Sequence, residues 1–146
     1  PLKPLSIPLK AVHRGVNLSH RDWCFLNEER HRMGQAWARY FNSFDLFLCP
    51  AATTVAFKHN QKGERWERMI DVNGVGQPTT TALFWAGYSG NFYLPATVAP
   101  VGLSPTGLPI GVQIVGAQYR DLLCIQFAQL LEAHYRSFEP PPNYDI

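Results

Sequence analysis

The sequence predicts a mixed α/β fold in which two or three strands are flanked by helices. Residues 96–101 and 110–115 are rich in Val and Ile and are separated by a Gly-, Ser- and Pro-rich stretch over 102–109. This pattern is typical of two strands joined by a turn. Apolar residues recur every three or four positions over 18–42, as they do on one face of a helix. The apolar run 46–49 follows this helix and predicts a further strand.

The N-terminal segment, residues 1–17, is predicted to be extended. Three prolines lie within its first 12 residues. Proline has no backbone N–H to donate, and the residue before a proline avoids helical angles. We interpret the segment as an extended stretch on the surface or as a connector to another part of a larger protein.

The segment 18–42 carries the strongest helix signal. Ser19 is placed to cap its N-terminus, and the charge of Asp22 suits the positive end of the helix dipole. The apolar positions are expected to form one buried stripe. Its members are Trp23, Leu26, Met33, Trp37, Tyr40, Phe41 and Phe44.

The charged residues of this helix are interpreted as its solvated face. Glu28 precedes Arg32 by four residues, the favourable order for an ion pair on a helix surface. Arg30 and His31 stand beside them in the sequence. We assign the whole cluster to solvent rather than to a binding site.

The rest of the chain gives weaker signals. Residues 51–78 are polar, and 73–76 is interpreted as a surface turn, because a proline follows where the helix of a phosphate-binding loop would begin. Residues 79–90 predict a short helix or an irregular apolar segment. A last helix is predicted over 121–135, and a proline-rich tail over 140–146 follows it.

Composition limits the classes of function. A length of 146 residues suits one domain, and a net charge of +2 is too small to indicate a nucleic-acid partner. No apolar run approaches the roughly 18 to 20 residues of a membrane span, so we expect a cytoplasmic protein with no membrane partner. The three cysteines, Cys24, Cys49 and Cys124, follow neither a disulfide nor a zinc pattern and are expected to be buried free thiols.

Residues 94–116 read L-P-A-T-V-A-P-V-G-L-S-P-T-G-L-P-I-G-V-Q-I-V-G. This stretch resembles the last conserved block of the amidase-signature hydrolases. The likeness lies in the Pro95-Ala96 pair, the Pro100-Val101-Gly102 turn and the Gly-Leu-Pro-x-Gly-x-Gln-x-Val-Gly run from Gly107 to Gly116. A looser likeness precedes it in the right order. The family has a long helix followed by an Asp and a hydrophobic strand ending at a Pro, which here are 45–50.

The resemblance implies a mixed-sheet amide hydrolase of which this chain is the C-terminal portion, spanning residues 18–139. The family uses a Ser–Ser–Lys triad near a Gly-Gly-Ser-Ser-Gly segment, upstream of the block found here. That segment is absent from these 146 residues, and the serines are scattered at Ser6, Ser19, Ser43, Ser89, Ser104 and Ser137. We therefore assign no catalytic residue, metal or cofactor to this chain. The whole enzyme would hydrolyse carboxylic amides through an acyl-enzyme.

The resemblance also implies a substrate-binding role for the aromatic segment ahead of residue 95. In the family this segment lines the acyl side of the substrate channel, and by position the wall residues are Phe84, Trp85, Tyr88 and Phe92. Packing in the core is an equally good interpretation of these four residues. The family has an Asn, two residues, a Gly and one further residue before its Pro-Ala pair. Here Asn91 is followed by Phe, Tyr and Leu, with no Gly.

Other classes of function stay open. A non-catalytic binding or scaffold module could retain this half of the fold, whereas a compact esterase is disfavoured by the scattered serines. Under the amidase hypothesis the partners are the N-terminal part of the enzyme and a small-molecule amide substrate. A portion cut from a wide sheet leaves a strand edge unpaired and an apolar face uncovered, so a homo-oligomer is also expected.

Overall fold

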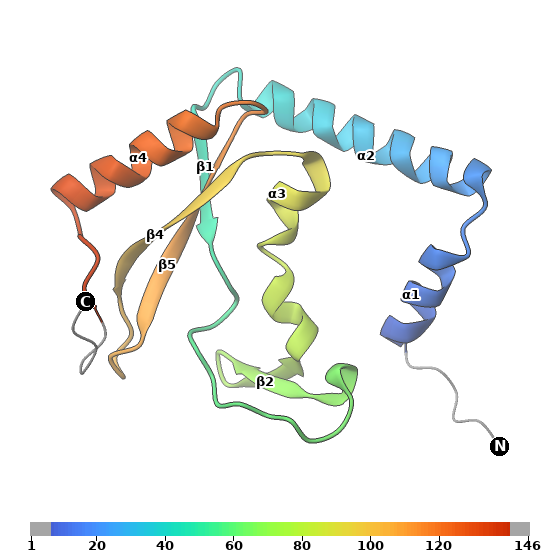
Figure 1. Cartoon of the computed structure of the whole chain (residues 1–146), viewed down its shortest axis with the longest axis horizontal. Coiled ribbons are helices and arrows are strands. Elements are labelled where there is room, and N and C mark those ends of the chain that lie inside the picture. The colour runs from blue at the N-terminus through green and yellow to red at the C-terminus, as the bar shows by residue number, and fades with distance from the viewer. Residues whose placement is uncertain (1–6, 141–146) are drawn as a thin grey trace.

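The computed structural model describes residues 7–140 of the chain. Its centre is an antiparallel sheet with strand order β1–β5–β4 (Figure 1). The three strands are Leu46–Pro50, Pro109–Gly116 and Ala96–Leu103, and helix α4, Asp121–His134, packs on them. This arrangement confirms the predicted mixed α/β class. Residues 1–6 and 141–146, which carry most of the predicted tail and the start of the predicted extended segment, lie outside the described residues.

The two strands predicted around the Gly-rich stretch form the β4–β5 hairpin, and each is slightly longer than predicted. In the connecting turn, Ser104 Oγ accepts a hydrogen bond from the Leu108 N–H at 3.0 Å. Gly107 has a φ of +80°, a left-handed angle that glycine adopts without steric cost. The register shifts between Pro100 and Gly102, where proline has no N–H for the ladder.

The core lies between the sheet and α4. Ile114 and Cys124 are fully buried, and Ala99 is 5% exposed. Phe127 and Leu131 of α4 pack against these three residues. Burial of an apolar side chain contributes roughly 1.5 to 3 kcal/mol relative to leaving it exposed. This region is therefore the main source of stability in the described chain.

Helix α2, His20–Tyr40, confirms the long predicted helix and its cap. Ser19 Oγ accepts a hydrogen bond from the Asp22 N–H at 3.1 Å. The ion pair predicted on its surface is also present, with Arg32 Nε 3.7 Å from Glu28 Oε1. Local sequence signals were sufficient for each of these features.

The prediction of one buried stripe along α2 is wrong for the N-terminal half of the helix. Trp23 and Leu26 in this half are 50% and 57% exposed. Further along the predicted stripe, the prediction is also wrong for Met33 and Phe44, which are 51% and 56% exposed. The helix reaches past the sheet, as Figure 1 shows, and within residues 7–140 its N-terminal half meets the rest of the chain mainly where Arg30 stacks on Tyr93. Only around Trp37 do the apolar side chains of α2 meet rings from β1 and α3.

Helix α1, Ile7–Val16, corrects the extended conformation predicted for residues 7–16. Pro8 stands at the second helical position. The first N–H groups of a helix have no intrahelical partner, so a proline in the first turn removes no hydrogen bond. The argument against a helix applies to prolines in its interior and does not apply here.

A second sheet consists of the two strands β2, Met69–Val72, and β3, Val75–Pro78. Asn73 and Gly74 form its turn with φ angles of +55° and +80°, as in a type I′ hairpin turn. The surface turn predicted over 73–76 is confirmed. The alternative, a phosphate-binding loop, is excluded. The two strands were not predicted, although Asn-Gly between short apolar runs is a hairpin signal.

Three short helices complete the structure. They are η1, Arg65–Glu67; η2, Thr79–Leu83; and α3, Gly87–Phe92. Residues 79–90 were predicted as a short helix or an irregular apolar segment, and the last two helices agree with the first of these alternatives. None of the helices within residues 7–140 is both long and apolar enough to cross a membrane.

Candidate functional site

The four predicted substrate-binding residues lie together in one cluster, which we call the aromatic wall: Phe84, Trp85, Tyr88 and Phe92. Tyr88 stands at its centre, with its ring 5.6 Å from Phe84 and 5.8 Å from Trp85 between centroids. Phe92 follows one turn later on α3. Edge-to-face and offset pairs at these distances are the favourable arrangements for aromatic rings.

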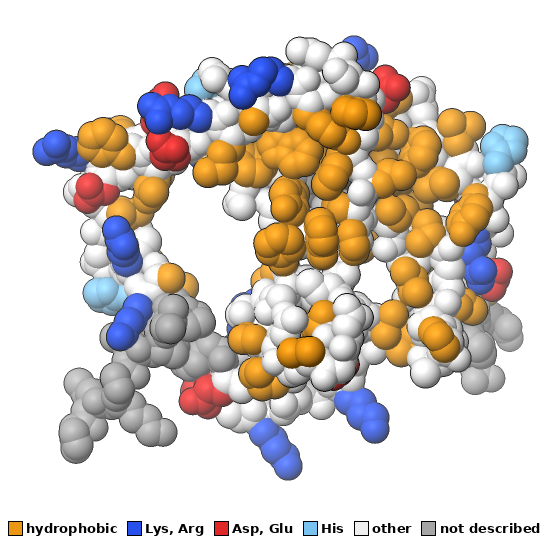
Figure 2. Space-filling view, turned by 180° about the vertical axis from the view of Figure 1, so that it is seen from behind, with side chains coloured by type: hydrophobic (Ala, Val, Ile, Leu, Met, Phe, Trp, Pro, Cys, Tyr) orange, Lys and Arg blue, Asp and Glu red, His pale blue; other side chains and the backbone are white. Residues whose placement is uncertain are grey.

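The aromatic wall joins the packing of α2 and β1. Trp37 of α2 lies 5.9 Å from Tyr88 and 6.3 Å from Phe92, and 5.1 Å from Phe47 of β1. Three members of the wall are half-buried, whereas Phe84 is 57% exposed. Figure 2 shows apolar side chains gathered in the middle of one face of the molecule. One side of the aromatic wall thus packs against α2 and β1, and on the other side the ring of Phe84 is exposed.

Gln113 of β5 holds the aromatic wall in position, and the sequence analysis gave this residue no role. This side chain of β5 is only 5% exposed. Its Nε2 donates to the backbone carbonyl of Trp85 at 3.2 Å and approaches Cys49 Sγ at 3.5 Å. A buried amide without partners would be costly, so these contacts hold the start of α3 against β5 and β1. A Gln within an otherwise apolar strand was the available signal.

A groove of about 850 Å³ runs between α2 and the segment that links α3 to β4. We call it the α2 groove. Charged, amide, small and apolar residues all line it, and Phe92 is the member of the aromatic wall among them. Its full lining is Asn27, Glu28, Arg30, His31, Gly34, Gln35, Ala38, Phe41, Asn91, Phe92, Tyr93, Leu94, Ala117 and Gln118.

Arg30 lines the α2 groove, so assigning it to the solvated face of the helix was wrong. It is half-buried, and its guanidinium carbon lies 4.4 Å from the centre of the Tyr93 ring. The guanidinium also donates to Tyr93 Oη and to Asn27 Oδ1. The first of these contacts joins residues 63 positions apart, which periodicity along one helix does not reveal.

Tyr93 occupies the position where the resembled family has its Gly, two residues before Pro95. It ends α3 with φ +56° and ψ +36°, the left-handed region. A bulky residue is rarely found there because its Cβ crowds the backbone. The turn therefore has the backbone angles that glycine would adopt easily. The stacking with Arg30 provides an interaction that glycine would lack.

A second hollow, of about 540 Å³, lies where β1 ends against β4 and β5. Its lining is mainly apolar, from Pro50 and the following residues together with Val98 and Ile110. Beside it, Thr53 Oγ1 is buried and has no hydrogen-bond partner within residues 7–140. None of the predicted site residues lines this hollow.

The cysteines divide into two environments. Cys49 and Cys124 are buried as predicted, whereas Cys24 is exposed on α2, which corrects the expectation for that residue. Burial raises the pKa of the Cys49 thiol, and the hydrogen bond from Gln113 opposes this in part. Burial and the nearby charge of Asp121 raise the pKa of the Cys124 thiol. A raised pKa keeps a thiol protonated and poorly nucleophilic, so neither residue is prepared for catalysis.

The described part of the chain also offers no metal centre. Among residues 7–140, no three His, Cys, Asp or Glu side chains stand close enough to hold an ion. The geometry therefore provides apolar and amide surfaces for binding.

Comparison with known proteins decides the family. A family model described as Amidase matches residues 6–125. The chain belongs to the amidase-signature family. A glutamyl-tRNA(Gln) amidotransferase subunit of Treponema pallidum is 33% identical over 103 residues, which are 70% of this chain and 18% of that protein. Fatty-acid amide hydrolase 2 of Homo sapiens is 32% identical over 102 residues, which are 68% of this chain and 16% of that protein.

Solved structures of this family share the fold. A bacterial aryl acylamidase superposes with a TM-score of 0.68 at 21% identity and covers 94% of this chain and 29% of its own. A glutamyl-tRNA(Gln) amidotransferase subunit of Thermotoga maritima gives a TM-score of 0.63 at 19% identity, over 99% of this chain and 32% of its own. The chain thus corresponds to a fragment of larger amidase-signature proteins.

Proposed function

We propose that this chain is the C-terminal portion of an enzyme that hydrolyses carboxylic amide C–N bonds through an acyl-enzyme. The Ser–Ser–Lys triad would lie in the part of the enzyme outside these 146 residues. One observation carries the proposal: the family match spans residues 6–125, yet the matching stretch is only 16–18% of two curated relatives. We call the longer polypeptide the parent enzyme. In it, this chain supplies core residues and a binding surface.

The aromatic wall would line the acyl side of the substrate channel in the parent enzyme. The open ring of Phe84 and the half-buried rings beside it offer apolar surface to the acyl group of a small amide. Burial of such surface contributes roughly 25 cal/mol per Å². The hydrogen bond from Gln113 to the Trp85 carbonyl keeps the wall in place, so little ordering is needed on binding. Neither a metal nor an organic cofactor takes part in this proposal.

The isolated chain is expected to have no amidase activity, because nucleophile, base and oxyanion donors must converge on one carbonyl. The experiment compares the isolated chain with the parent enzyme, using aryl and aliphatic amides and a fluorophosphonate probe for reactive serines. The parent is expected to turn over and to be labelled, and the isolated chain to do neither. Stoichiometric labelling of a serine in the isolated chain would contradict the proposal. A parent without activity or label would favour the binding or scaffold module.

Replacing Trp85 with Ala in the parent tests the wall. We expect kcat/KM to fall for bulky amides and to change little for small ones, because a channel wall contacts the larger substrate. Truncation of a fully buried Trp would instead cost about 3 to 5 kcal/mol of stability. Phe138→Ala, at an exposed aromatic outside the wall, is the control. A large drop in melting temperature with unchanged selectivity would assign Trp85 to the core.

Self-association of the isolated chain stays a prediction. In the described sheet, β1 and β4 are the outer strands, each with one side unpaired within residues 7–140. Unpaired edges recruit other strands. Light scattering at micromolar concentration is expected to show a dimer or a larger species, and a clean monomer would contradict this expectation.

A further inference from the structure

The exposed half of α2 and the α2 groove form one continuous surface. Trp23, Asn27, Arg30, Gly34 and Ala38 follow each other at intervals of three or four residues and therefore share one side of the helix. A hollow of about 250 Å³ at the exposed end is lined by Trp23, Leu26, Asn27 and Arg30. Asn27 and Arg30 also line the α2 groove, so the two depressions meet there. We call these residues, Leu26 included, the α2 face.

The middle of the α2 face carries only small side chains. A Cβ placed on Gly34 would meet no atom within 4 Å, and the next residue along the face is Ala38. Large apolar side chains stand at the exposed end, where Trp23 and Leu26 are 50% and 57% exposed. Small residues between larger ones let another backbone approach closely. The shape thus suits a protein segment that crosses α2 near Gly34.

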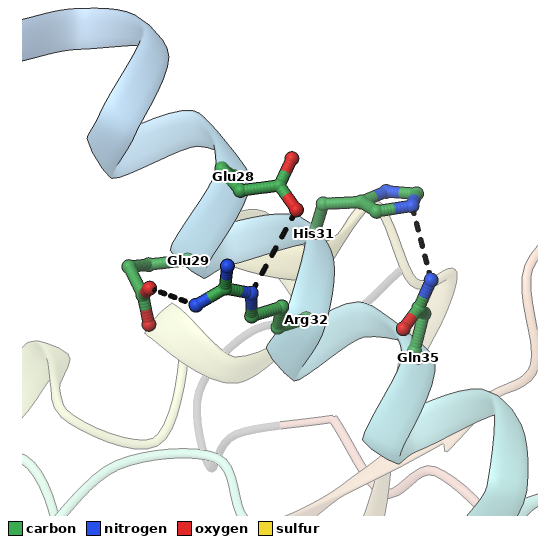
Figure 3. Close-up of polar contacts among 5 residues, drawn as sticks. All are labelled: Glu28, Glu29, His31, Arg32 and Gln35. Carbon is green, nitrogen blue, oxygen red and sulfur yellow. Dashed lines mark hydrogen bonds and ion pairs between the residues drawn. The ribbon is translucent and has the colours of Figure 1, made fainter.

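The charge of Arg30 is available to such a segment. Within residues 7–140, no carboxylate lies within 4 Å of its guanidinium, and the two neighbouring carboxylates, Glu28 in the same groove and Glu29, contact Arg32 instead. Figure 3 shows that Arg32 contacts both of them, at 3.7 Å from Glu28 and 2.7 Å from Glu29. The contacts of Arg30 with Asn27 and Tyr93 fix its planar group and leave further N–H donors free. A guanidinium held in this way is prepared to bind a carboxylate.

The lengths of the related proteins indicate what covers this face. Solved structures that superpose on 90–99% of this chain contain about three times as many residues, because the chain is only 28–32% of theirs. In Figure 1, α1 and α2 form an arm that reaches away from the sheet. The arm has apolar side chains of half exposure or more and no buried residue along α2. A body outside this chain would bury them.

We propose that the α2 face is the docking surface for the remaining part of the parent enzyme. An apolar segment from that part crosses α2 at Gly34 and places a carboxylate against Arg30. The inference rests on the proposed function for the existence of the parent. It goes further by identifying the surface, the crossing point and the charge that the incoming segment carries.

Three variants test the crossing point. Gly34→Leu adds a bulky side chain at the crossing point, and Gly34→Ala is its small control. Ala36→Leu adds similar bulk to an exposed position two residues on, which is turned roughly 200° away on a helix. In the isolated chain, none of the three is expected to lower the melting temperature, because position 34 faces open space. In the parent, Gly34→Leu is expected to lower it by several degrees, and the other two are not.

Arg30 is tested in the same pair of proteins. Arg30→Gln removes the charge, whereas Arg30→Lys retains it without the planar group. If a carboxylate docks on Arg30, Arg30→Gln lowers the melting temperature of the parent more than Arg30→Lys does. The difference is absent in the isolated chain. Equal effects of both variants in the parent would contradict the carboxylate.

A photocrosslink identifies the occupant directly. Benzoylphenylalanine in place of Trp23 in the parent is expected to link to a peptide upstream of residue 1, and benzoylphenylalanine in place of Ala36 is not. Links only to a second copy of the molecule, or only within residues 7–140, would overturn the docking proposal. The amidase assay of the unmodified parent is read separately. An active parent in which Gly34→Leu behaves like Ala36→Leu refutes the docking, whereas an inactive parent that Gly34→Leu destabilises refutes the proposed function alone.

Discussion

Helices α2 and α4 differ in what covers them. Helix α4 packs on the sheet, buries Cys124 completely and contributes Phe127 and Leu131 to the core. Helix α2 is longer, yet none of its residues is buried. Both helices are rich in apolar residues, and α4 exposes Leu122, Ile125 and Leu130 on the side away from the core. Periodicity therefore identifies the apolar residues of a helix and leaves open whether the same chain covers them.

The consequence is an uneven distribution of stability. The core between α4 and the sheet is closed within the described chain, whereas the N-terminal half of α2 gains little until something packs on it. Matched substitutions in the two regions of the isolated chain should therefore give unequal effects. The same substitutions in the parent enzyme would show how much of the difference docking removes.

The largest difference is expected between Ile114→Ala and Leu26→Ala. Ile114 is fully buried, and removing it leaves a cavity that costs about 2 to 5 kcal/mol. Leu26 is 57% exposed, and its loss should cost less than about 0.5 kcal/mol in the isolated chain. Urea unfolding followed by circular dichroism measures both. Equal losses would show that the N-terminal half of α2 is already packed in the isolated chain.

A smaller contrast, with opposite signs, is expected from Gly116→Ala and Gly34→Ala. A Cβ at Gly116 would lie 2.7 Å from Cys124 Sγ, so the change should destabilise by about 1 to 3 kcal/mol. At Gly34 there is open space, and Ala should stabilise the helix by about 0.5 to 1 kcal/mol. Urea unfolding of the two variants measures both changes.

Replacing Cys124 tests whether its sulfur causes the loss of stability in Gly116→Ala. If the contact with Cys124 Sγ is responsible, Cys124→Ala should recover part of the loss when it is combined with Gly116→Ala. Additive losses in the double variant would mean that the strain lies elsewhere, for example at the Arg120 carbonyl 3.4 Å from the same Cβ.

The smallest effect concerns pH. The pKa values of the Cys49 and Cys124 thiols are raised above their ordinary 9.0 by burial, so the unfolded chain loses these protons first as pH rises. Their contribution to stability is complete below pH 9 and is lost as pH rises toward the folded-state pKa values. Between about pH 8 and 10, the melting temperature should fall more steeply for the native chain than for a Cys49→Ala, Cys124→Ala variant. Parallel curves would contradict the assignment.

Much of the fold was predictable because its signals are local. The β4–β5 hairpin follows from short β-branched runs around a Gly- and Pro-rich turn, and the start of α2 follows from the cap at Ser19. Helix α1 and the β2–β3 hairpin were not predicted, although their signals are also local. Pro8 fits the first turn of a helix, and Asn73-Gly74 fits a hairpin turn.

Features that depend on residues far apart in the chain became visible only in the folded structure. The stacking of Arg30 on Tyr93, the hydrogen bond from Gln113 to the Trp85 carbonyl and the exposure of Trp23 have no local signature. Each depends on whether the fold brings a second element close to the side chain, and that element supplies the contacts. From the sequence came the α2 helix, the strands β1, β4 and β5, the helix α4, the family resemblance and the four residues proposed for the aromatic wall. The physical reason is that hydrogen bonding and periodicity act within a few residues, whereas burial depends on the whole fold.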